Sequence, residues 1–201
     1  MKAEEYYKKI ESKWVNEYPS VESLDDVWKF YKECGYQDPQ KTLMSILNEV
    51  SWKENKVLDF GCDNGLMLKF ICDSVNDIQG FGIDINSKAI EKANERFPEL
   101  QFQSFNGVTI PFEDKYFDLV FVCAVIKHIR YEDRKKVYNE LKRVAHNVFF
   151  IEIDAKTEQE VPHQAWTFYH SHFEEEFKKH FQPLKVIHEA GDLLGLYEIE
   201  R

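Results

Sequence analysis

The chain has 201 residues, 43% hydrophobic and 15% aromatic, a composition typical of a packed globular protein and unlike that of a disordered chain. Its formal net charge of −10, from 26 basic and 36 acidic residues, repels phosphate backbones, so no nucleic-acid partner is expected. There is no CxxC pair, no signal-peptide-like start and no apolar stretch long enough to span a bilayer, so we expect a cytoplasmic protein without a membrane partner.

The first part of the chain is predicted to be helical, over residues 4–14, 21–33 and 38–50, because apolar residues recur there at spacings of three and four. Tyr6, Tyr7, Trp14, Trp28 and Tyr31 give these helices large apolar faces. Such helices either pack on a sheet edge or cap a ligand cleft, and the sequence favours neither. We expect residues 1–50 to form a helical cap segment on a domain over 51–201, within one compact unit.

From residue 56 onward, short apolar runs alternate with amphipathic segments. Strands are predicted near residues 56–60, 79–84, 100–105, 117–123, 147–153, 184–189 and 194–199. Helices are predicted near residues 65–75, 87–96, 131–145 and 170–181. This alternation predicts an α/β fold with a mostly parallel sheet and helices on both faces, in which ligands bind beyond the carboxyl ends of the strands.

The last two predicted strands lie in the segments PLKVIHEA and LLGLYEIER, and only Gly191 and Asp192 stand between these segments. So short a connection has no room for a crossover helix, so these strands must pair antiparallel as a hairpin.

The first strand ends in a glycine-bearing turn within the segment KVLDFGCDNGLMLKF. Asp59 ends the strand, Gly61 and Gly65 bracket the turn, and a helix starts at about Gly65. Glycines at such a turn allow a ligand to approach the backbone, and a helix start offers unpaired N–H donors. Alone, the turn is equally compatible with a purely structural role.

A second motif follows at the end of the next strand, in GFGIDINSKAIEKA. Asp84 lies nineteen residues after Gly65, and Asn86 or Ser87 is placed to cap the next helix. An acidic residue at about this distance from a glycine turn is placed to accept hydrogen bonds from a ribose diol. The ligand predicted by the two motifs is therefore a nucleoside.

A third motif covers the segment FQSFNGVTIPFEDKYFDLVFVCAVIKHI. Asn106 follows the third strand, where its amide is placed to hydrogen-bond an adenine edge, and Asp118 opens a strand that ends near Cys123. Asn106 and Gly107 are also an ordinary turn pair.

These three segments, in this order, resemble the class I S-adenosylmethionine-dependent methyltransferases, particularly the small-molecule branch with a pattern like LDLGCGTG followed by PF-x-x-x-x-FD. The resemblance covers residues 50–200 and is strongest over 56–130. It implies a Rossmann-like, seven-stranded, mostly parallel sheet with an antiparallel C-terminal strand. It also implies S-adenosylmethionine as cofactor, S-adenosylhomocysteine as product and a small-molecule acceptor.

The resemblance also implies nine cofactor contacts. They are Asp59, Gly61, Cys62 and Gly65 at the methionine end, Asp84 at the ribose hydroxyls, Ile85 beside the adenine, Asn106 and Gly107 at the adenine edge, and Cys123 next to the sulfonium. The chain departs from the family at Asp63, which stands in place of the middle glycine. Aspartate tolerates positive φ, so the turn is expected to survive, with a carboxylate near that of the cofactor.

His128, just after the fourth strand, is the first candidate for a general base toward an acceptor whose hydroxyl or amine must lose a proton, although its position favours a packing role over a catalytic one. The segment with His163, His170 and His172 is predicted to be a substrate-facing loop over 155–172. A zinc site at His170 and His172 needs further ligands that no motif supplies, so no metal is expected.

Two other sets of side chains in this half of the chain have a structural interpretation. Trp166, Phe168 and Tyr169 either wall the acceptor pocket or belong to the core. Basic residues at 130 and 134–136 alternate with acidic ones and are predicted to form a solvated helix face.

Two other functional classes share parts of this pattern. A nicotinamide-dependent oxidoreductase requires GxGxxG, but Asp63 and Leu66 replace two of those glycines. A non-catalytic nucleoside-binding or regulatory protein with the same fold is the second alternative. Within the methyltransferases, an (N/D)PP(Y/F) motif and a catechol-type aspartate after the fourth strand are both absent.

Overall fold

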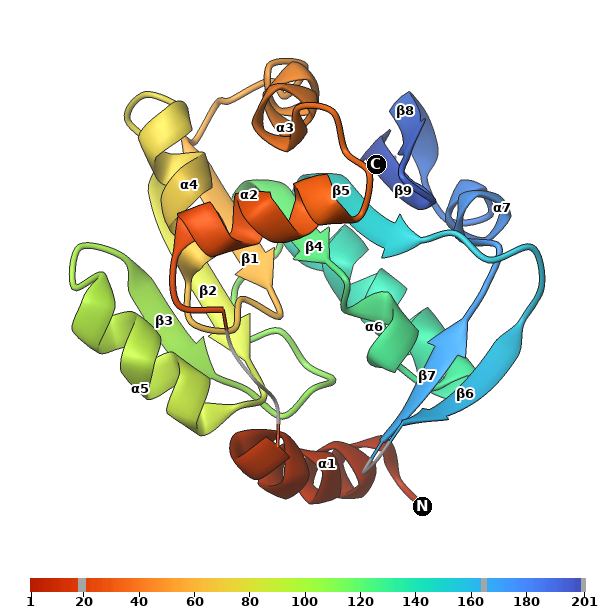
Figure 1. Ribbon diagram of the computed structural model, residues 1–201. Coiled ribbons are helices and arrows are strands. Elements are labelled where there is room, and N and C mark those ends of the chain that lie inside the picture. The colour runs from red at the N-terminus through yellow and green to blue at the C-terminus, as the bar shows by residue number, and fades with distance from the viewer. Residues whose placement is uncertain (18–20, 164–165, 200–201) are drawn as a thin grey trace.

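The computed structural model describes residues 1–17, 21–163 and 166–199. Its main sheet has seven strands in the order β3-β2-β1-β4-β5-β9-β8 (Figure 1). The strands are β1 (Lys56–Phe60), β2 (Gln79–Asp84), β3 (Gln101–Ser104), β4 (Phe117–Cys123), β5 (Ala145–Ile153), β8 (Gln182–Glu189) and β9 (Asp192–Glu198). Each of the seven predicted strands is present, with ends shifted by no more than two residues.

The first five strands are parallel, and β9 pairs antiparallel with both β5 and β8. The predicted C-terminal hairpin is therefore confirmed, although its two-residue turn is Ala190–Gly191, because Asp192 already pairs with Glu189. The winding direction reverses between β1 and β4, where an open α/β sheet forms its ligand crevice.

Helices cover both faces of this sheet, as predicted. They are α1 (Ala3–Glu17), α2 (Leu24–Glu33), α3 (Pro39–Leu47), α4 (Leu66–Ser74), α5 (Ser87–Arg96), α6 (Tyr131–Val144) and α7 (Phe173–Lys178), with a 3-10 turn η1 (Ile126–His128) after β4. One apolar cluster joins α6 and α7 to one face through Tyr138, Phe150 and Phe177. The second joins α3, α4 and α5 to the other face through Leu43, Leu68 and Phe121.

The N-terminal helices occupy two different places. Helix α1 lies beyond the carboxyl ends of β1 and β2 (Figure 1), whereas α2 and α3 belong to the apolar cluster of a sheet face through Trp28 and Ile46. Helix α1 therefore has the position of a cap, whereas α2 and α3 pack on a face of the sheet and not at its edge. A boundary at residue 50 stays a prediction, because α2 and α3 share their cluster with the sheet.

The predicted loop over 155–172 is wrong. Strands β6 (Gln159–His163) and β7 (Trp166–His170) form an antiparallel hairpin there, so His170 lies in a strand and α7 begins only at Phe173. The helix begins at this point because an Asp154 carboxylate oxygen accepts hydrogen bonds from the N–H groups of Phe173 and Glu174, at 2.5 and 3.3 Å. Within the described parts of the chain, no helix has the length and apolar character needed to cross a bilayer.

Candidate functional site

The turn after β1 is fixed to the neighbouring strand β2. The N–H groups of Gly61 and Cys62 both donate to the carbonyl of Ile83, at 2.8 and 3.1 Å. Gly61 and Gly65 adopt φ of 81° and 82°, and Asp63 adopts 45°. The prediction that aspartate is tolerated at the middle position of the turn is therefore confirmed for the backbone.

Asp84 connects this turn to the loop after β2. Its two carboxylate oxygens accept hydrogen bonds from the N–H groups of Asp63 and Asn86, at 2.9 and 2.8 Å. Burial raises the pKa of the Asp84 carboxyl to about 6. Each oxygen keeps a second lone pair, so the carboxylate is preorganised and still able to accept from a ligand hydroxyl.

A cavity opens where these two loops meet the end of β4. Six of the site residues predicted from the sequence line this cavity. They are Gly61, Asp84, Ile85, Gly107, Cys123 and His128. Asp63 also contributes to the wall, and α1 closes the cavity with Tyr7 and Ile10. The Tyr7 hydroxyl donates to Asp133 of α6 at 3.3 Å, which ties this part of α1 to the rest of the wall. The cavity therefore lies at the switch point of the sheet, beneath the N-terminal helix.

Four of the predicted cofactor residues lie outside the lining. Asp59 is buried beneath the turn, and burial, followed by the charges of Asp84 and Asp63, raises its pKa well above its ordinary value. Cys62 packs in the apolar cluster that holds α4, and Gly65 caps α4 with an N–H bonded to the Cys62 carbonyl at 2.9 Å.

Asn106 is the fourth of these residues. Its side-chain oxygen accepts from the N–H groups of Val108 and Thr109, at 2.9 and 2.8 Å. This is the hydrogen bonding of a turn, which was the alternative interpretation of the Asn106–Gly107 pair. Asn106 also borders a shallow hollow next to the cavity, together with Ile85 and Tyr7.

The β6–β7 hairpin packs against η1, which itself contributes His128 to the cavity lining. The ring of His128 lies 5.0 Å from that of Phe168, and the Lys127 ammonium lies 5.6 Å from the centre of the same ring. Tyr169 of the hairpin reaches α1, where its hydroxyl is 3.3 Å from that of Tyr6. The side chains of Trp14, His163 and Trp166 lie outside the described parts of the structure.

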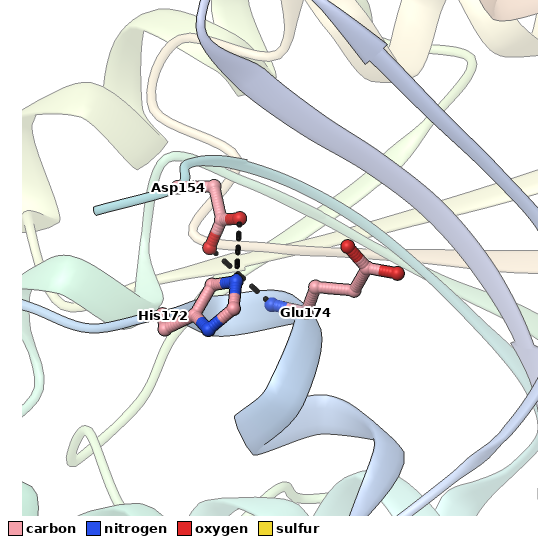
Figure 2. Close-up of side chains that lie close together, drawn as sticks. All are labelled: Asp154, His172 and Glu174. Carbon is pink, nitrogen blue, oxygen red and sulfur yellow. Dashed lines mark hydrogen bonds and ion pairs between the residues drawn. The ribbon is translucent and has the colours of Figure 1, made fainter. Parts of the chain in front are cut away.

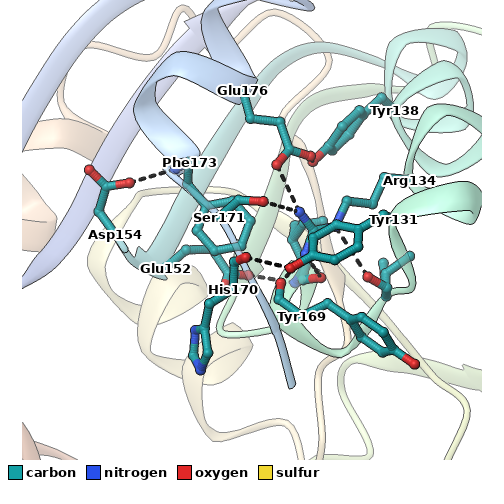
Figure 3. A network of polar contacts seen from close by, with 12 residues as sticks. Tyr131, Arg134, Tyr138, Glu152, Asp154, Tyr169, His170, Ser171, Phe173 and Glu176 are labelled. Atoms are coloured by element: carbon teal, nitrogen blue, oxygen red, sulfur yellow. Dashed lines mark hydrogen bonds and ion pairs between the residues drawn. The ribbon is translucent and has the colours of Figure 1, made fainter. Parts of the chain in front are cut away.

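A buried guanidinium joins α6 to η1, to the β6–β7 hairpin and to α7. Arg134 of α6 is 3% exposed and donates to Ser171 and Glu176, both at 2.7 Å, and to the carbonyl of Tyr169 (Figure 3). It also donates to the Ile129 carbonyl after η1, at 3.1 Å. The prediction of a solvated basic face is therefore wrong at Arg134. This side chain is buried, and it donates to backbone carbonyls after η1 and in β7.

Glu152, at the carboxyl end of β5, supports η1 from below. It is 1% exposed, and one of its oxygens accepts from the Ile126 N–H at 2.5 Å. Burial raises the pKa of this carboxyl to about 7, against the lowering influence of Lys127. The turn that carries His128 is thus held by a buried acid on the neighbouring strand.

Sequence reasoning missed the cavity walls that come from α1 and from the loop after β4. The missed residues there are Tyr7, Ile10, Ala124, Val125 and Ile129, and three more lining residues, Phe60, Asn86 and Phe105, were missed at or after the ends of β1, β2 and β3. Tyr7 and Ile10 are three positions apart on one helical face, which is the pattern of a buried stripe. That pattern could not tell which surface the stripe covers.

Comparisons with known proteins agree with this geometry. Residues 57–148 match the family described as "Methyltransferase domain". The chain is 29% identical to 27-O-demethylrifamycin SV methyltransferase of Amycolatopsis mediterranei over 137 residues, which cover 60% of this chain and 49% of that protein. It is 32% identical to a putative 23S rRNA (guanine-N(1)-)-methyltransferase of Bacillus subtilis over 94 residues, or 44% of this chain and 33% of that protein.

Solved structures share the fold. The chain superposes with a TM-score of 0.61 on a SAM-dependent methyltransferase from Aquifex aeolicus, at 22% identity, covering 82% of this chain and 90% of that one. The chain spans about half the length of the curated relatives it matches.

Proposed function

From the class I S-adenosylmethionine-dependent methyltransferase domain that this chain contains, we propose that the protein transfers the methyl group of that cofactor to a small-molecule acceptor. The observation that carries the proposal is the convergence of Gly61, Asp84, Ile85, Cys123 and His128 on one cavity beyond the strand ends. This is the place where a sheet of this topology binds its ligands.

The residues present fit an adenosyl sulfonium compound. At Gly61, a Cβ atom would lie 2.4 Å from a Val125 methyl carbon, so the absent side chain keeps this wall open. Asp84, Ile85 and Gly107 all line the cavity, and we assign Asp84 to the ribose hydroxyls, Ile85 to the face of the adenine and Gly107 to its edge. Carboxylates at Asp63 and Asp84 give the cavity a negative potential that favours a cationic sulfonium and ammonium.

The bound cofactor supplies a methyl group that is already activated by its sulfonium. The protein therefore needs to align the acceptor with the C–S bond and to exclude water. We assign water exclusion to Tyr7 and Ile10 of α1, which lie over the cavity. His128 is placed to take a proton from an acceptor hydroxyl or amine at the end of β4.

A small acceptor is favoured over a polymer for two reasons. The cavity is covered by Tyr7 and Ile10 of α1, which favours a small acceptor that fits inside it over a folded RNA. The net charge of −10 also repels a phosphate backbone. The rifamycin relative has a small-molecule acceptor in its name, whereas the Bacillus subtilis relative is named for RNA, so RNA is the alternative to test.

Calorimetry with S-adenosylmethionine, S-adenosylhomocysteine and NADH tests the cofactor assignment. We expect binding of the first two only, and Asp84→Ala to weaken it by about 1.5 kcal/mol or more, as for a lost charged hydrogen bond. Asp73→Ala is the control, because Asp73 is an exposed acid of α4 that is paired with Lys69. Unchanged affinity in Asp84→Ala contradicts the ribose contact, and NADH binding contradicts the methyltransferase assignment.

A further inference from the structure

A cluster of metal-ligating side chains lies outside the nucleoside cavity, at the start of α7. Asp154, His172 and Glu174 each place one ligand atom within 4.8 Å of the others (Figure 2). Asp154 follows β5, and the other two residues stand at the entrance of α7. The geometry points to a divalent transition-metal site, with Zn²⁺ as the best-matched ion, and this inference stands apart from the proposed methyl transfer.

The donor distances suit a tetrahedral ion. Zn²⁺ binds imidazole nitrogen and carboxylate oxygen at about 2.0–2.2 Å, which places neighbouring ligand atoms about 3.4 Å apart in a tetrahedron. The His172 Nε2 atom lies 3.5 Å from Asp154 Oδ2. The two groups already have the spacing that a shared ion requires, and an imidazole in the set favours Zn²⁺ over Mg²⁺.

The Asp154 carboxylate is held in position by bonds that leave one oxygen available. Oδ1 accepts from the Phe173 and Glu174 N–H groups at 2.5 and 3.3 Å, whereas Oδ2 is the oxygen that faces His172. Asp154 is 11% exposed and His172 is 46% exposed, so the site is anchored on one side and reachable from solvent on the other.

Glu174 completes the set and is itself oriented by two basic partners. Its carboxylate oxygens lie 2.7 Å from the Lys178 ammonium and 2.9 Å from His188 Nε2. A metal ion would compete with these partners for the carboxylate. It would also neutralise the two acids, and the basic partner on the oxygen that the ion does not take would remain to orient Glu174.

The site lies at the base of the β6–β7 hairpin. Asp154 and His172 flank the segment 155–171, which contains β6 and β7, and the Ala155 N–H donates to the Ser171 carbonyl at 2.9 Å across its base. A shared ion would close this base with coordinate bonds. Because β7 packs on η1 and its Tyr169 reaches Tyr6 of α1, an ion at the base would stiffen the hairpin that supports these two elements of the cavity.

Calorimetric titration with ZnCl₂ of the protein freed of any affinity tag tests the site. We expect one equivalent to bind, and His172→Gln and Asp154→Asn each to weaken binding by about tenfold or more. Asparagine keeps the Oδ1 cap of α7 and loses only the carboxylate charge. Glu175→Gln is the matched control, because it removes a neighbouring charge of the same helix from outside the set, and its affinity should equal that of the wild type.

A second measurement reports the hairpin directly. Saturating Zn²⁺ should slow proteolytic cleavage within residues 155–171 in the wild type and in Glu175→Gln, and leave the cleavage rate of His172→Gln unchanged. Co²⁺ should give visible d–d absorption in the wild type that His172→Gln lacks. Absence of stoichiometric binding, or equal Zn²⁺ affinity in all four proteins, overturns the proposal. Thermal unfolding of each variant without metal verifies that the folds compared are the same.

Discussion

Gly61 is a glycine for two reasons, its positive φ and its close contact with Val125, and replacing it by alanine tests both. The φ of 81° puts an alanine in the left-handed region, at a cost of about 1–2 kcal/mol. Its Cβ would also lie 2.4 Å from Val125 Cγ2, and overpacking of this kind costs about 1–3 kcal/mol. We therefore expect Gly61→Ala to lower the free energy of unfolding by about 2–5 kcal/mol, a large share of the roughly 5–15 kcal/mol of a typical domain.

Gly191 supplies the matched control for the backbone component. Its φ is 90°, and an added Cβ would meet nothing within 4 Å. Gly191→Ala should therefore cost only the left-handed penalty of about 1–2 kcal/mol. Urea denaturation of both variants gives the steric component by difference. The double variant Gly61→Ala/Val125→Ala, compared with Val125→Ala alone, should recover most of it.

Calorimetry of the same variants measures the effect on the ligand. Val125 lines the cavity, so relief of the contact by rotation of its side chain would move its methyl groups into the space for the nucleoside. Cofactor affinity should fall in Gly61→Ala and stay unchanged in Gly191→Ala. Equal losses of stability in the two glycine variants, with no recovery in the double variant, would refute the steric argument.

Two further predictions concern the wall that carries His128. Burial raises the pKa of Glu152 to about 7 from an ordinary 4.5, so the folded state holds this proton more tightly than the unfolded state. The stabilisation is complete below pH 4.5 and is lost as the pH rises through 7, a decrease of about 3 kcal/mol at 1.36 kcal/mol per pKa unit. Glu152→Gln should remove that slope from the unfolding free energy measured against pH, and an identical slope contradicts the burial argument. His128→Gln should lower turnover by about 100-fold or more on an acceptor that must lose a proton, without weakening cofactor binding. Turnover measured as S-adenosylhomocysteine release that matches the wild type would leave His128 a packing role.

The sequence was sufficient for the sheet because each strand of the nucleotide-binding half has a local signal. The runs 56–60 and 117–123 are mostly apolar segments bounded by turn residues, which is the pattern of strands buried on both faces. Asp84 was identified by its spacing from Gly65 alone, and it lines the cavity. Local patterns predict the positions of Gly61 and Asp84 because each lies in a strand–turn–helix unit that is continuous in the sequence.

The β6–β7 hairpin lacks that kind of signal. Its strands are short, one contains Pro162, and the polar residues around it favour a loop. What stabilises it is distant in sequence: Arg134 donates to the Tyr169 carbonyl, and Tyr131 donates to the His170 carbonyl at 2.7 Å. Hydrogen bonds from side chains of α6 to the carbonyls of β7 leave no hydrophobic periodicity in the sequence of β7 itself.

The same difference explains why the sequence pointed to Gly61 and Asp84 in the lining of the cavity and missed the residues of α1. Tyr6 and Tyr169, whose hydroxyls meet at 3.3 Å, are separated by 163 residues, and the wall they form joins α1 to the hairpin. Neither segment is part of the strand–turn–helix units that position Gly61 and Asp84. The acceptor side can therefore change in shape without disturbing the glycine turn or the carboxylate of Asp84. Substrate specificity in this chain should accordingly reside in α1, η1 and the β6–β7 hairpin, and exchange of residues there should alter acceptor choice while cofactor affinity is retained.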